Sequence, residues 1–351
     1  MILTEKSNPV SMAKAFAIIL MVLAHSHFSD FGSKLINMFH MPLFFFFSGY
    51  CFKEKYLSDF KSFSVKKVKG LYIPYVKWCL IFLLLHNIFF YLNIYNDTYG
   101  FRGKVSYEYG FKDFAFKAFL IVGLMSGNEQ LLGGYWFIRS LFLSSLITFL
   151  VIKFVKKPAI PIVLFILISM LMSFYHKGIP FVGIGPKELL GSLFFYIGYL
   201  YKKNFDRELP LSIYFISALI VILGTFCWQM NLMNVVYWKI LPWVISAIFG
   251  ILFIYKLCYF IDKKNIWGTK LLIYIGDNTQ TVLTWHFLSF KIISLLIIIL
   301  YNLPYERLAE FPVIDEYSTK GWWLAYCFVG VFIPISVNML FDYCKKRKTN
   351  L

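Results

Sequence analysis

The stretch KILPWVISAIFGILFIYKLCYFI, residues 239–261, carries only two charged side chains, Lys239 and Lys256. A helix needs about 20 apolar residues to cross the hydrocarbon core of a bilayer, so this run is long enough to span one. The composition extends the point to the whole chain. Of its 351 residues, 59% are hydrophobic and only 15% are charged, whereas soluble domains carry roughly 25% charged residues. We therefore predict an all-α, polytopic protein embedded in a lipid bilayer.

Ten apolar stretches are predicted to be membrane-spanning helices. They are residues 12–28, 36–52, 71–92, 135–152, 159–175, 188–201, 210–228, 239–261, 280–301 and 321–343. A shorter apolar stretch, 114–125, is predicted to be interfacial or re-entrant. The first span resembles a signal peptide, but further spans follow at once, so we expect it to remain uncleaved. We expect one membrane domain, residues 1–351, without an appended soluble domain.

The Lys and Arg residues fall mainly in every second loop. If the N-terminus is inside, 22 of the 35 basic residues lie in inner segments and 10 lie in outer segments. Cytoplasmic loops of membrane proteins carry this excess of positive charge. We therefore predict that both termini face the cytoplasm, in the cytoplasmic membrane of the cell.

Several classes of function are excluded. The net charge of +17 comes from short loops between apolar runs, so it indicates membrane topology and not nucleic-acid binding. None of the six cysteines forms a CxxC pair, which predicts neither a metal site nor a disulfide framework. The chain lacks a phosphate loop, a dinucleotide fingerprint, a nucleophile elbow and an HExxH motif. We expect no permanently bound cofactor.

Ionisable side chains inside a membrane are costly, so each is a functional candidate. Lys14 and His25 lie eleven residues apart on one predicted helix. That spacing is within about 20° of whole turns, so both side chains face the same direction, about 16 Å apart along the axis. His27 is predicted to point to the opposite side. The alternative for His25 is a histidine near a helix end that binds a backbone carbonyl.

The second span begins FHMPLFFFFSGY, residues 39–50. Pro42 removes a backbone donor and disturbs the hydrogen bond to the Met38 carbonyl. His40 is predicted at a depth similar to that of His25, so the two histidines could share a site. The alternative is an aromatic-rich helix that packs at the membrane interface.

Two further spans contain ionisable groups. Arg139, in YWFIRSLF, lies about one turn in from the outer end of its span. It could be a fixed cation for an anionic or carbonyl group, or it could extend to the interface. His286, in IGDNTQTVLTWHF, lies about 9 Å from the inner end of its span by helical rise.

Taken in order, these segments resemble the acyltransferase 3 family of integral membrane acyltransferases. The resemblance covers nearly the whole chain. It is carried by Lys14 and His25, FHMPLFFFFSGY, KKVKGLYIPY, YWFIRSLF, FFYIGYLYKKN and IGDNTQTVLTWHF. Many members have Arg at the position of Lys14 and an acidic residue at the position of Ser11. Lysine keeps the charge but not the bidentate fork of arginine.

The resemblance implies O-acyl transfer, usually of acetyl from acetyl-CoA, to a hydroxyl of a cell-surface polysaccharide or its lipid-linked precursor. It places the catalytic function at His25 and matches His40 to the histidine of the second span. A neutral imidazole can accept the hydroxyl proton near neutral pH. His40 or Arg139 could stabilise the developing negative charge. Acyl-CoA would then be a donor substrate, and a covalent acyl-histidine relay is an alternative route.

The donor is polyanionic, and the inner face is predicted to be basic. Lys14, Lys66, Lys67 and Lys69 are therefore candidate donor-binding residues, with His286 positioning the donor. The alternative is that the lysines only set the topology.

A different class of function stays open: a polysaccharide exporter or flippase without acyl-transfer chemistry. Some proteins described as exporters resemble the same family. A passive conduit does not need Lys14 and His25 on one helix face, which favours the enzyme.

The basic asymmetry makes a prediction about topology. Reporter fusions after Asp59, Asn96, Lys157 and Leu351 should report inside, outside, inside and inside, because the positive segments remain cytoplasmic. An outside signal at Leu351 would contradict the arrangement with both termini in the cytoplasm.

Overall fold

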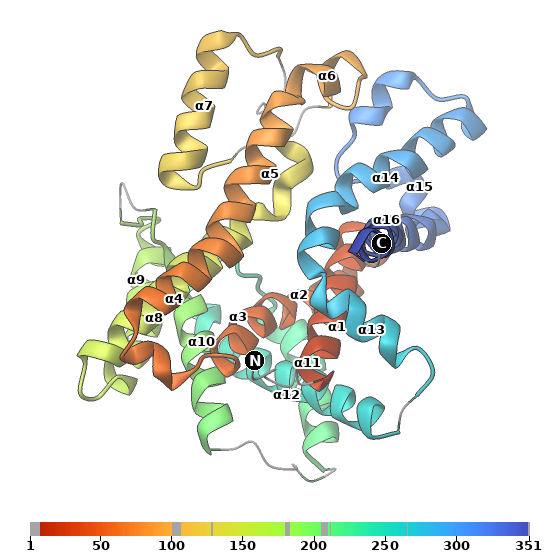
Figure 1. Cartoon of the computed structure of the whole chain (residues 1–351). Coiled ribbons are helices and arrows are strands. Elements are labelled where there is room, and N and C mark those ends of the chain that lie inside the picture. Colours follow the sequence, from red (N-terminus) through yellow and green to blue (C-terminus); the bar gives the residue numbers. More distant parts are fainter. Residues whose placement is uncertain are drawn as a thin grey trace. The chain divides into compact units, whose positions relative to one another are not determined.

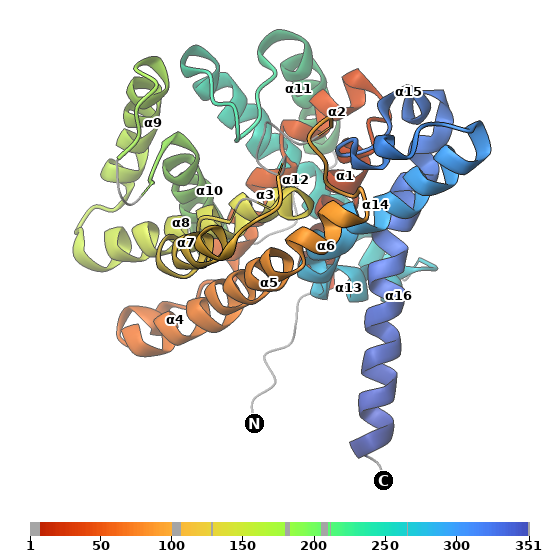
Figure 2. The same ribbon diagram turned by 90° about the horizontal axis from the view of Figure 1, so that it is seen from above.

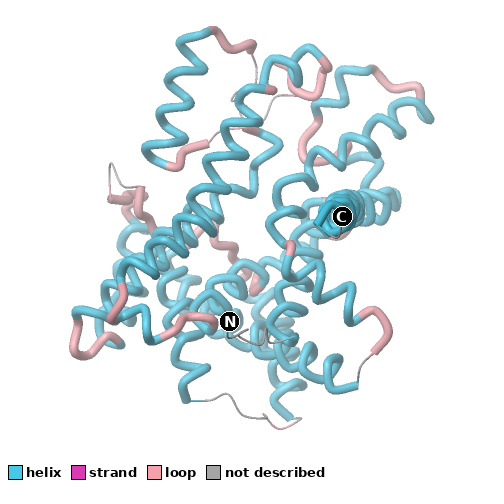
Figure 3. The backbone as a smooth tube through the Cα atoms, in the orientation of Figure 1, coloured by secondary structure: helices cyan, strands magenta, loops and turns pink. Residues whose placement is uncertain are grey.

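The computed structural model describes residues 8–99, 107–127, 129–179, 183–204, 210, 212–264 and 266–349. Within these ranges the chain is almost wholly helical (Figure 3). The strand-like pairing found there is an isolated bridge between Ile179 and Ile184. The all-α prediction is therefore confirmed.

Long apolar helices make up much of the described chain. Five segments are long and apolar enough to cross a membrane: Asn8–His25, Gln130–Phe154, Tyr237–Lys264, Thr279–Tyr301 and Asp315–Lys345. Two shorter apolar helices are Ala159–Phe174 and Ser212–Trp228. The other predicted spans coincide with shorter or interrupted helices, which are α3 (His40–Tyr50), α5 (Ile73–Leu84) with α6 (His86–Tyr91), and α10 (Pro186–Asn204). The protein is thus a multi-pass helical membrane protein, whereas the count of ten and the orientation stay predictions.

The chain forms two compact units. Unit 1 consists of Met1–Ala17, Lys34–Ile73 and Phe137–Gly276, and unit 2 consists of Ile18–Ser33, Pro74–Trp136 and Asp277–Leu351. The helices α1 (Asn8–His25) and α2 (Asp30–Asn37) are divided between the two units, and the others below are placed in the unit that holds all but one terminal residue or the whole helix. The remaining helices of unit 1 are α3 (His40–Tyr50), α4 (Phe60–Lys67), α8 (Trp136–Phe154), α9 (Ala159–Phe174), α10 (Pro186–Asn204), α11 (Ser212–Trp228), α12 (Ile240–Lys264) and α13 (Thr269–Asp277) (Figure 1). Those of unit 2 are α5 (Ile73–Leu84), α6 (His86–Tyr91), α7 (Phe111–Leu124), α14 (Thr279–Tyr301), α15 (Asp315–Tyr317) and α16 (Trp323–Thr349).

Two helix ends differ from the sequence prediction. The first span was expected to reach residue 28, but α1 ends at His25. The Ser26 hydroxyl donates to the Leu23 carbonyl at 2.7 Å, and His27 has a φ of +52°, which a helix does not allow. The second span is broken between α2 and α3. Pro42 lies in the first turn of α3, where its missing N–H leaves no helical bond unmade.

Unit 1 is held by direct backbone contact between α3 and α10. A Cβ atom on Gly49 would lie 1.8 Å from the Phe195 carbonyl oxygen, and one on Gly198 would lie 1.9 Å from that of Phe46. Small residues allow helices to approach this closely in a membrane, where lipid tails provide no hydrophobic drive between helices. The two glycines therefore fix the position of α3, which begins at His40.

Unit 2 is built around α14, which packs against α16 and crosses it (Figure 2). A Cβ on Gly330 of α16 would meet the Phe290 ring at 2.4 Å and Val22 of α1 at 2.9 Å. A Cβ on Gly134, in the short 3₁₀ helix η4 (Gln130–Tyr135), would meet Leu283 at 2.8 Å. The end of α1, η4 and α16 therefore all lie close against α14.

The packing of α3 on α10 leads to a stability prediction. Gly198→Ala should destabilise the protein by about 1–3 kcal/mol, because the new methyl meets backbone that cannot rotate away. Gly123→Ala is the matched control. It lies inside α7 with nothing within 4 Å of its Cβ position, and should stabilise by about 0.4–1 kcal/mol. Thermal unfolding of the detergent-purified variants measures both. Equal melting temperatures would show that α3 and α10 do not touch as described.

Candidate active site

Two histidines that are far apart in the sequence lie together in unit 2. His25 ends α1, and His286 lies about two turns into α14. Their ring centroids are 5.7 Å apart with an interplanar angle of 27°. The Phe287 ring lies 5.0 Å from that of His25. The sequence placed His286 near the inner end of its span, and gave no indication that it would lie beside His25.

The His286 ring has one satisfied nitrogen and one bare nitrogen. Nδ1 lies 3.1 Å from the Val282 carbonyl oxygen and 3.0 Å from that of Leu283. Carbonyls only accept, so we assign the proton to Nδ1, which leaves a lone pair on Nε2. The side chain is fully buried, and its Nε2 has no hydrogen-bond partner among the described residues. A buried acceptor without a partner is uncommon in folded proteins, so this nitrogen is a candidate for binding a substrate atom or a water molecule.

Aromatic rings surround this histidine pair. Phe290 stands at 90° to the His286 ring with centroids 5.8 Å apart, and Phe287 packs on Phe311 at 4.6 Å. Two residues before His286, the Thr284 hydroxyl bonds to Tyr135 of η4 at 2.7 Å. These rings exclude water from His286, which is fully buried, while His25 is half-buried. Electrostatic interactions made by His286 are therefore strengthened.

His40 has a similar local geometry in unit 1. It is 6% exposed, and its Nδ1 lies 2.8 Å from the Ile36 carbonyl oxygen. By the same reasoning Nδ1 carries the proton and Nε2 is an acceptor. His40 and His25 belong to different compact units, so a site shared by them stays a prediction.

Arg139 lies on α8 in unit 1, half-buried. Its Nη1 is 3.4 Å from the Gly183 carbonyl oxygen, at the long end of the hydrogen-bond range. The neighbouring Ser140 hydroxyl donates to the buried carboxylate of Glu188 at 2.6 Å, and the Gly185 amide donates to the same carboxylate at 2.8 Å. Glu188 therefore caps the start of α10. A catalytic role for Arg139 stays a prediction.

The predicted donor lysines lie in unit 1 and differ in their surroundings. Lys67 donates to the Ser48 hydroxyl at 3.2 Å and lies 5.3 Å from the Phe195 ring. Lys66 lies 5.3 Å from the Tyr56 ring, while Lys69 is exposed. Lys14 is half-buried on α1. Two of the four candidates are thus held over aromatic faces, an arrangement favourable for cations.

An exposed ion pair also lies in unit 1. Lys203, at the end of α10, donates to Glu54 at 2.7 Å, and the Tyr199 hydroxyl donates to the same carboxylate at 2.8 Å. The hydrogen bond from Lys203 lowers the pKa of Glu54 from its ordinary value. Glu54 therefore stays ionised, and its negative charge offsets the positive charge of Lys203.

Other residues of unit 2 were not recognised as a site from the sequence. Lys291 of α14 is buried, and its Nζ donates to the carbonyls of Leu308 and Glu310 at 2.8 and 2.7 Å. Arg307 forms an ion pair with Glu310 in the segment that follows α14. The sequence feature that could have indicated this group is the segment 305–310, YERLAE, which places three charged residues directly after an apolar span. Such a segment is equally common in ordinary loops.

Comparison with known families agrees with the motifs. The model of the acyltransferase 3 family, described as an acyltransferase domain, matches residues 10–339. Comparisons with curated proteins and with solved structures give no match. Because the family model covers nearly the whole chain, the protein belongs to this family of membrane acyltransferases.

Proposed function

We propose that this protein is an O-acetyltransferase of the cytoplasmic membrane. It moves an acetyl group from cytosolic acetyl-CoA to a hydroxyl of a cell-surface polysaccharide or lipid-linked glycan. The observation that supports this best is the contact of the half-buried His25 with the buried His286, whose Nε2 has no partner among the described residues.

His25 is the general base in this mechanism. It removes the proton from the acceptor hydroxyl as the oxygen attacks the thioester carbonyl. A C–O bond forms and the carbonyl oxygen becomes negative. The intermediate then expels the CoA thiolate by breaking the C–S bond, and His25 returns its proton to the sulfur. Histidine suits both steps because it changes charge near neutral pH.

His286 is a positioning residue for His25 in this proposal. Its Nδ1 is anchored by two backbone carbonyls, so the ring cannot rotate freely. The bare Nε2 can accept one hydrogen bond from a substrate or from a neighbouring donor. His40 and Arg139 are proposed to stabilise the oxyanion, and the inner lysines to attract the CoA phosphates. In direct transfer the acceptor hydroxyl is the only nucleophile. In the alternative, an acyl-histidine relay, a histidine of the same set would first accept the acyl group and then pass it to the hydroxyl.

The first test replaces the base. His25→Ala should lower the rate of acetyl transfer by about 100- to 10,000-fold, the usual effect of losing a general base. The variant should still insert, purify and bind acetyl-CoA, because these depend on other residues. His286→Phe keeps an aromatic ring but removes Nε2, and should also reduce transfer. Release of the CoA thiol and binding of acetyl-CoA are measured on the same preparations.

The matched control is His176→Ala. His176 is an exposed histidine in a turn of unit 1, and its loss should leave transfer near the wild-type rate. His27 is a poor control, because it lies outside the helix and pairs with Asp315. If the His25 variant transferred acetyl at a near-normal rate, the base would be wrong and the exporter would become the better hypothesis.

A second test concerns donor binding. Replacing Lys66, Lys67 and Lys69 together with Gln should raise the KM for acetyl-CoA about tenfold, because each exposed ionic contact contributes up to about 1 kcal/mol. Lys67→Gln alone should matter more than Lys69→Gln, because Lys67 is already fixed against Ser48. Steady-state kinetics with varied donor gives both values, and the KM for the acceptor should not change.

The control for this test is Lys112→Gln, which removes an exposed lysine from α7 in a predicted outer segment. An unchanged donor KM in the triple variant, with the topology intact, would leave these lysines only their topological role.

A further inference from the structure

An apolar groove of about 920 Å³ lies within unit 2, between α14 and α16. Trp78 of α5 and Leu308 of the segment after α14 contribute to its other walls. Along α14 its lining begins at Gln280 and ends at Leu295, which is about 22 Å of helix. The reaction proposed above gives none of these side chains a role.

The length of the groove suits the hydrocarbon chain of a lipid. Both α14 and α16 belong to segments that are long and apolar enough to span a membrane. One leaflet supplies about 15 Å of the hydrocarbon thickness of a bilayer, so a groove of about 22 Å can hold the chain of a lipid in that leaflet. Ile292, Val337 and Phe341 line the groove and are exposed in the protein alone. They therefore present apolar surface that a chain can cover.

One end of the groove is polar. The side chains of Gln280, Thr281 and Asn338 line it there. The Asn338 amide of α16 donates to the Asn278 side chain at 3.2 Å, so the start of α14 and the second half of α16 meet at this end. The buried Nε2 of Gln280 has no hydrogen-bond partner among the described residues. This end thus offers amide and hydroxyl groups to a polar head group.

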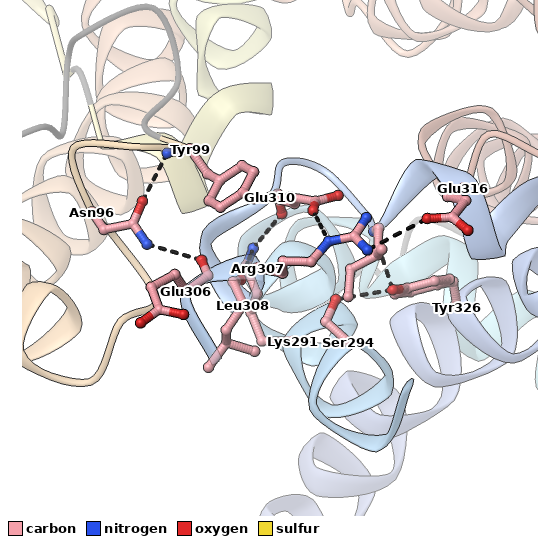
Figure 4. A network of polar contacts seen from close by, with 11 residues as sticks. Asn96, Tyr99, Lys291, Ser294, Glu306, Arg307, Leu308, Glu310, Glu316 and Tyr326 are labelled. Carbon is pink, nitrogen blue, oxygen red and sulfur yellow. Dashed lines mark hydrogen bonds and ion pairs between the residues drawn. The ribbon is translucent and has the colours of Figure 1, made fainter. Parts of the chain in front are cut away.

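The other end of the groove is apolar, although a lysine lies there. Lys291 is buried, and its Nζ donates to the carbonyls of Leu308 and Glu310 at 2.8 and 2.7 Å (Figure 4). Its charged group is therefore bound to the backbone, and the groove wall receives its aliphatic stem. Leu295 and Leu308 line the same end. These groups suit the terminal part of an acyl chain.

Positive charge is concentrated just beyond the polar end. After Phe341, the last residue of α16 that lines the groove, the helix continues into KKRK, residues 345–348. Lys345 and Arg347 are exposed, and these four basic residues stand against one acidic residue, Asp342. Clusters of four or more basic residues at the cytoplasmic end of a membrane helix bind anionic lipid head groups. Charge complementarity therefore favours an anionic phospholipid over a zwitterionic one.

We propose that this groove binds one anionic phospholipid of the leaflet that faces the basic end of α16, which is the cytoplasmic leaflet in the predicted topology. The head group lies between Gln280 and the basic residues, and one acyl chain follows α14 towards Leu295. The lipid is a structural ligand and not a substrate, so this inference is independent of the proposed function. Thr284 and Trp285 line the groove directly before His286. The lipid thus also packs against the turn of α14 that carries this histidine.

The experiment identifies the lipids that stay bound. The full-length protein is exchanged into mixed micelles that contain equal amounts of phosphatidylglycerol and phosphatidylcholine with the same acyl chains. Native mass spectrometry then records which lipids remain on the protein as the detergent is removed. One phosphatidylglycerol per protein should be retained, with an affinity about 10- to 100-fold above that of phosphatidylcholine, because each basic residue near an anionic head group adds attraction.

The first pair of variants tests the charge. Lys345→Gln combined with Arg347→Gln should weaken phosphatidylglycerol binding about 10- to 30-fold and leave phosphatidylcholine binding unchanged. The matched control combines Lys156→Gln with Lys157→Gln, which removes two exposed charges from another predicted inner segment. Its phosphatidylglycerol binding should equal that of the wild type.

The second pair of variants tests the groove. Ile292→Trp places a large ring in the space assigned to the chain and should weaken phosphatidylglycerol binding about 5- to 100-fold. Ile299→Trp is the matched control, because it makes the same change on the same helix at an exposed residue outside the groove. If the Ile292 variant fails to fold, the charge variants still test the proposal, because they lie at the exposed end of α16.

Four results would overturn the proposal. Both phospholipids could be retained equally, or retention could be unchanged in the variants. An equimolar polyprenyl phosphate could displace phosphatidylglycerol, which would assign the groove to a carrier lipid. A protein dimer without bound lipid would assign it to a second copy of the chain. Acetyl-CoA is absent throughout, so the outcome does not depend on the histidine tests.

Discussion

Close approach of helices at glycine is the constraint on which the rest of this structure depends. Gly49 and Gly198 bring α3 and α10 into backbone contact, Gly276 does the same for α13 against Ser11 of α1, and Gly330 admits the Phe290 ring. Hydrocarbon tails are as apolar as leucine side chains, so tight packing has to replace the hydrophobic drive that folds soluble proteins. The candidate site benefits directly, because His25 and His286 meet where α1 and α16 close on α14.

The fold could be predicted from the sequence much further than the site could. Hydropathy is a local property, so an apolar run such as 239–261 predicts its helix without knowledge of its neighbours. The spacing of Lys14 and His25 made His25 a candidate for the same reason. The partnership of His25 with His286 could not be foreseen, because it depends on how two distant helices pack. Helix ends such as His25 were also misplaced, since a single residue with positive φ decides them.

The polar contacts within unit 2 are explained by the absence of water from the interior of a membrane. The segment after α14 is only a short 3₁₀ helix, Tyr305–Ala309, so most of its carbonyls need partners from side chains. Lys291 and Asn96 supply them, which explains a buried lysine that has no carboxylate as its hydrogen-bond partner. Lys291 lies within a predicted span, but the sequence does not show which groups it bonds. Its role became clear only when the loop was seen folded back onto the helix.

The basic residues of unit 1 have a further consequence. Lys66, Lys67 and Lys202 lie over the rings of Tyr56, Phe195 and Tyr50. A free lysine carries about 2 kcal/mol of rotamer entropy, which is lost when the side chain is immobilised by a ligand. Side chains already resting on aromatic faces have given up part of that freedom during folding. Part of the entropy cost of ordering these three lysines is therefore already met in the folded protein, before any ligand binds.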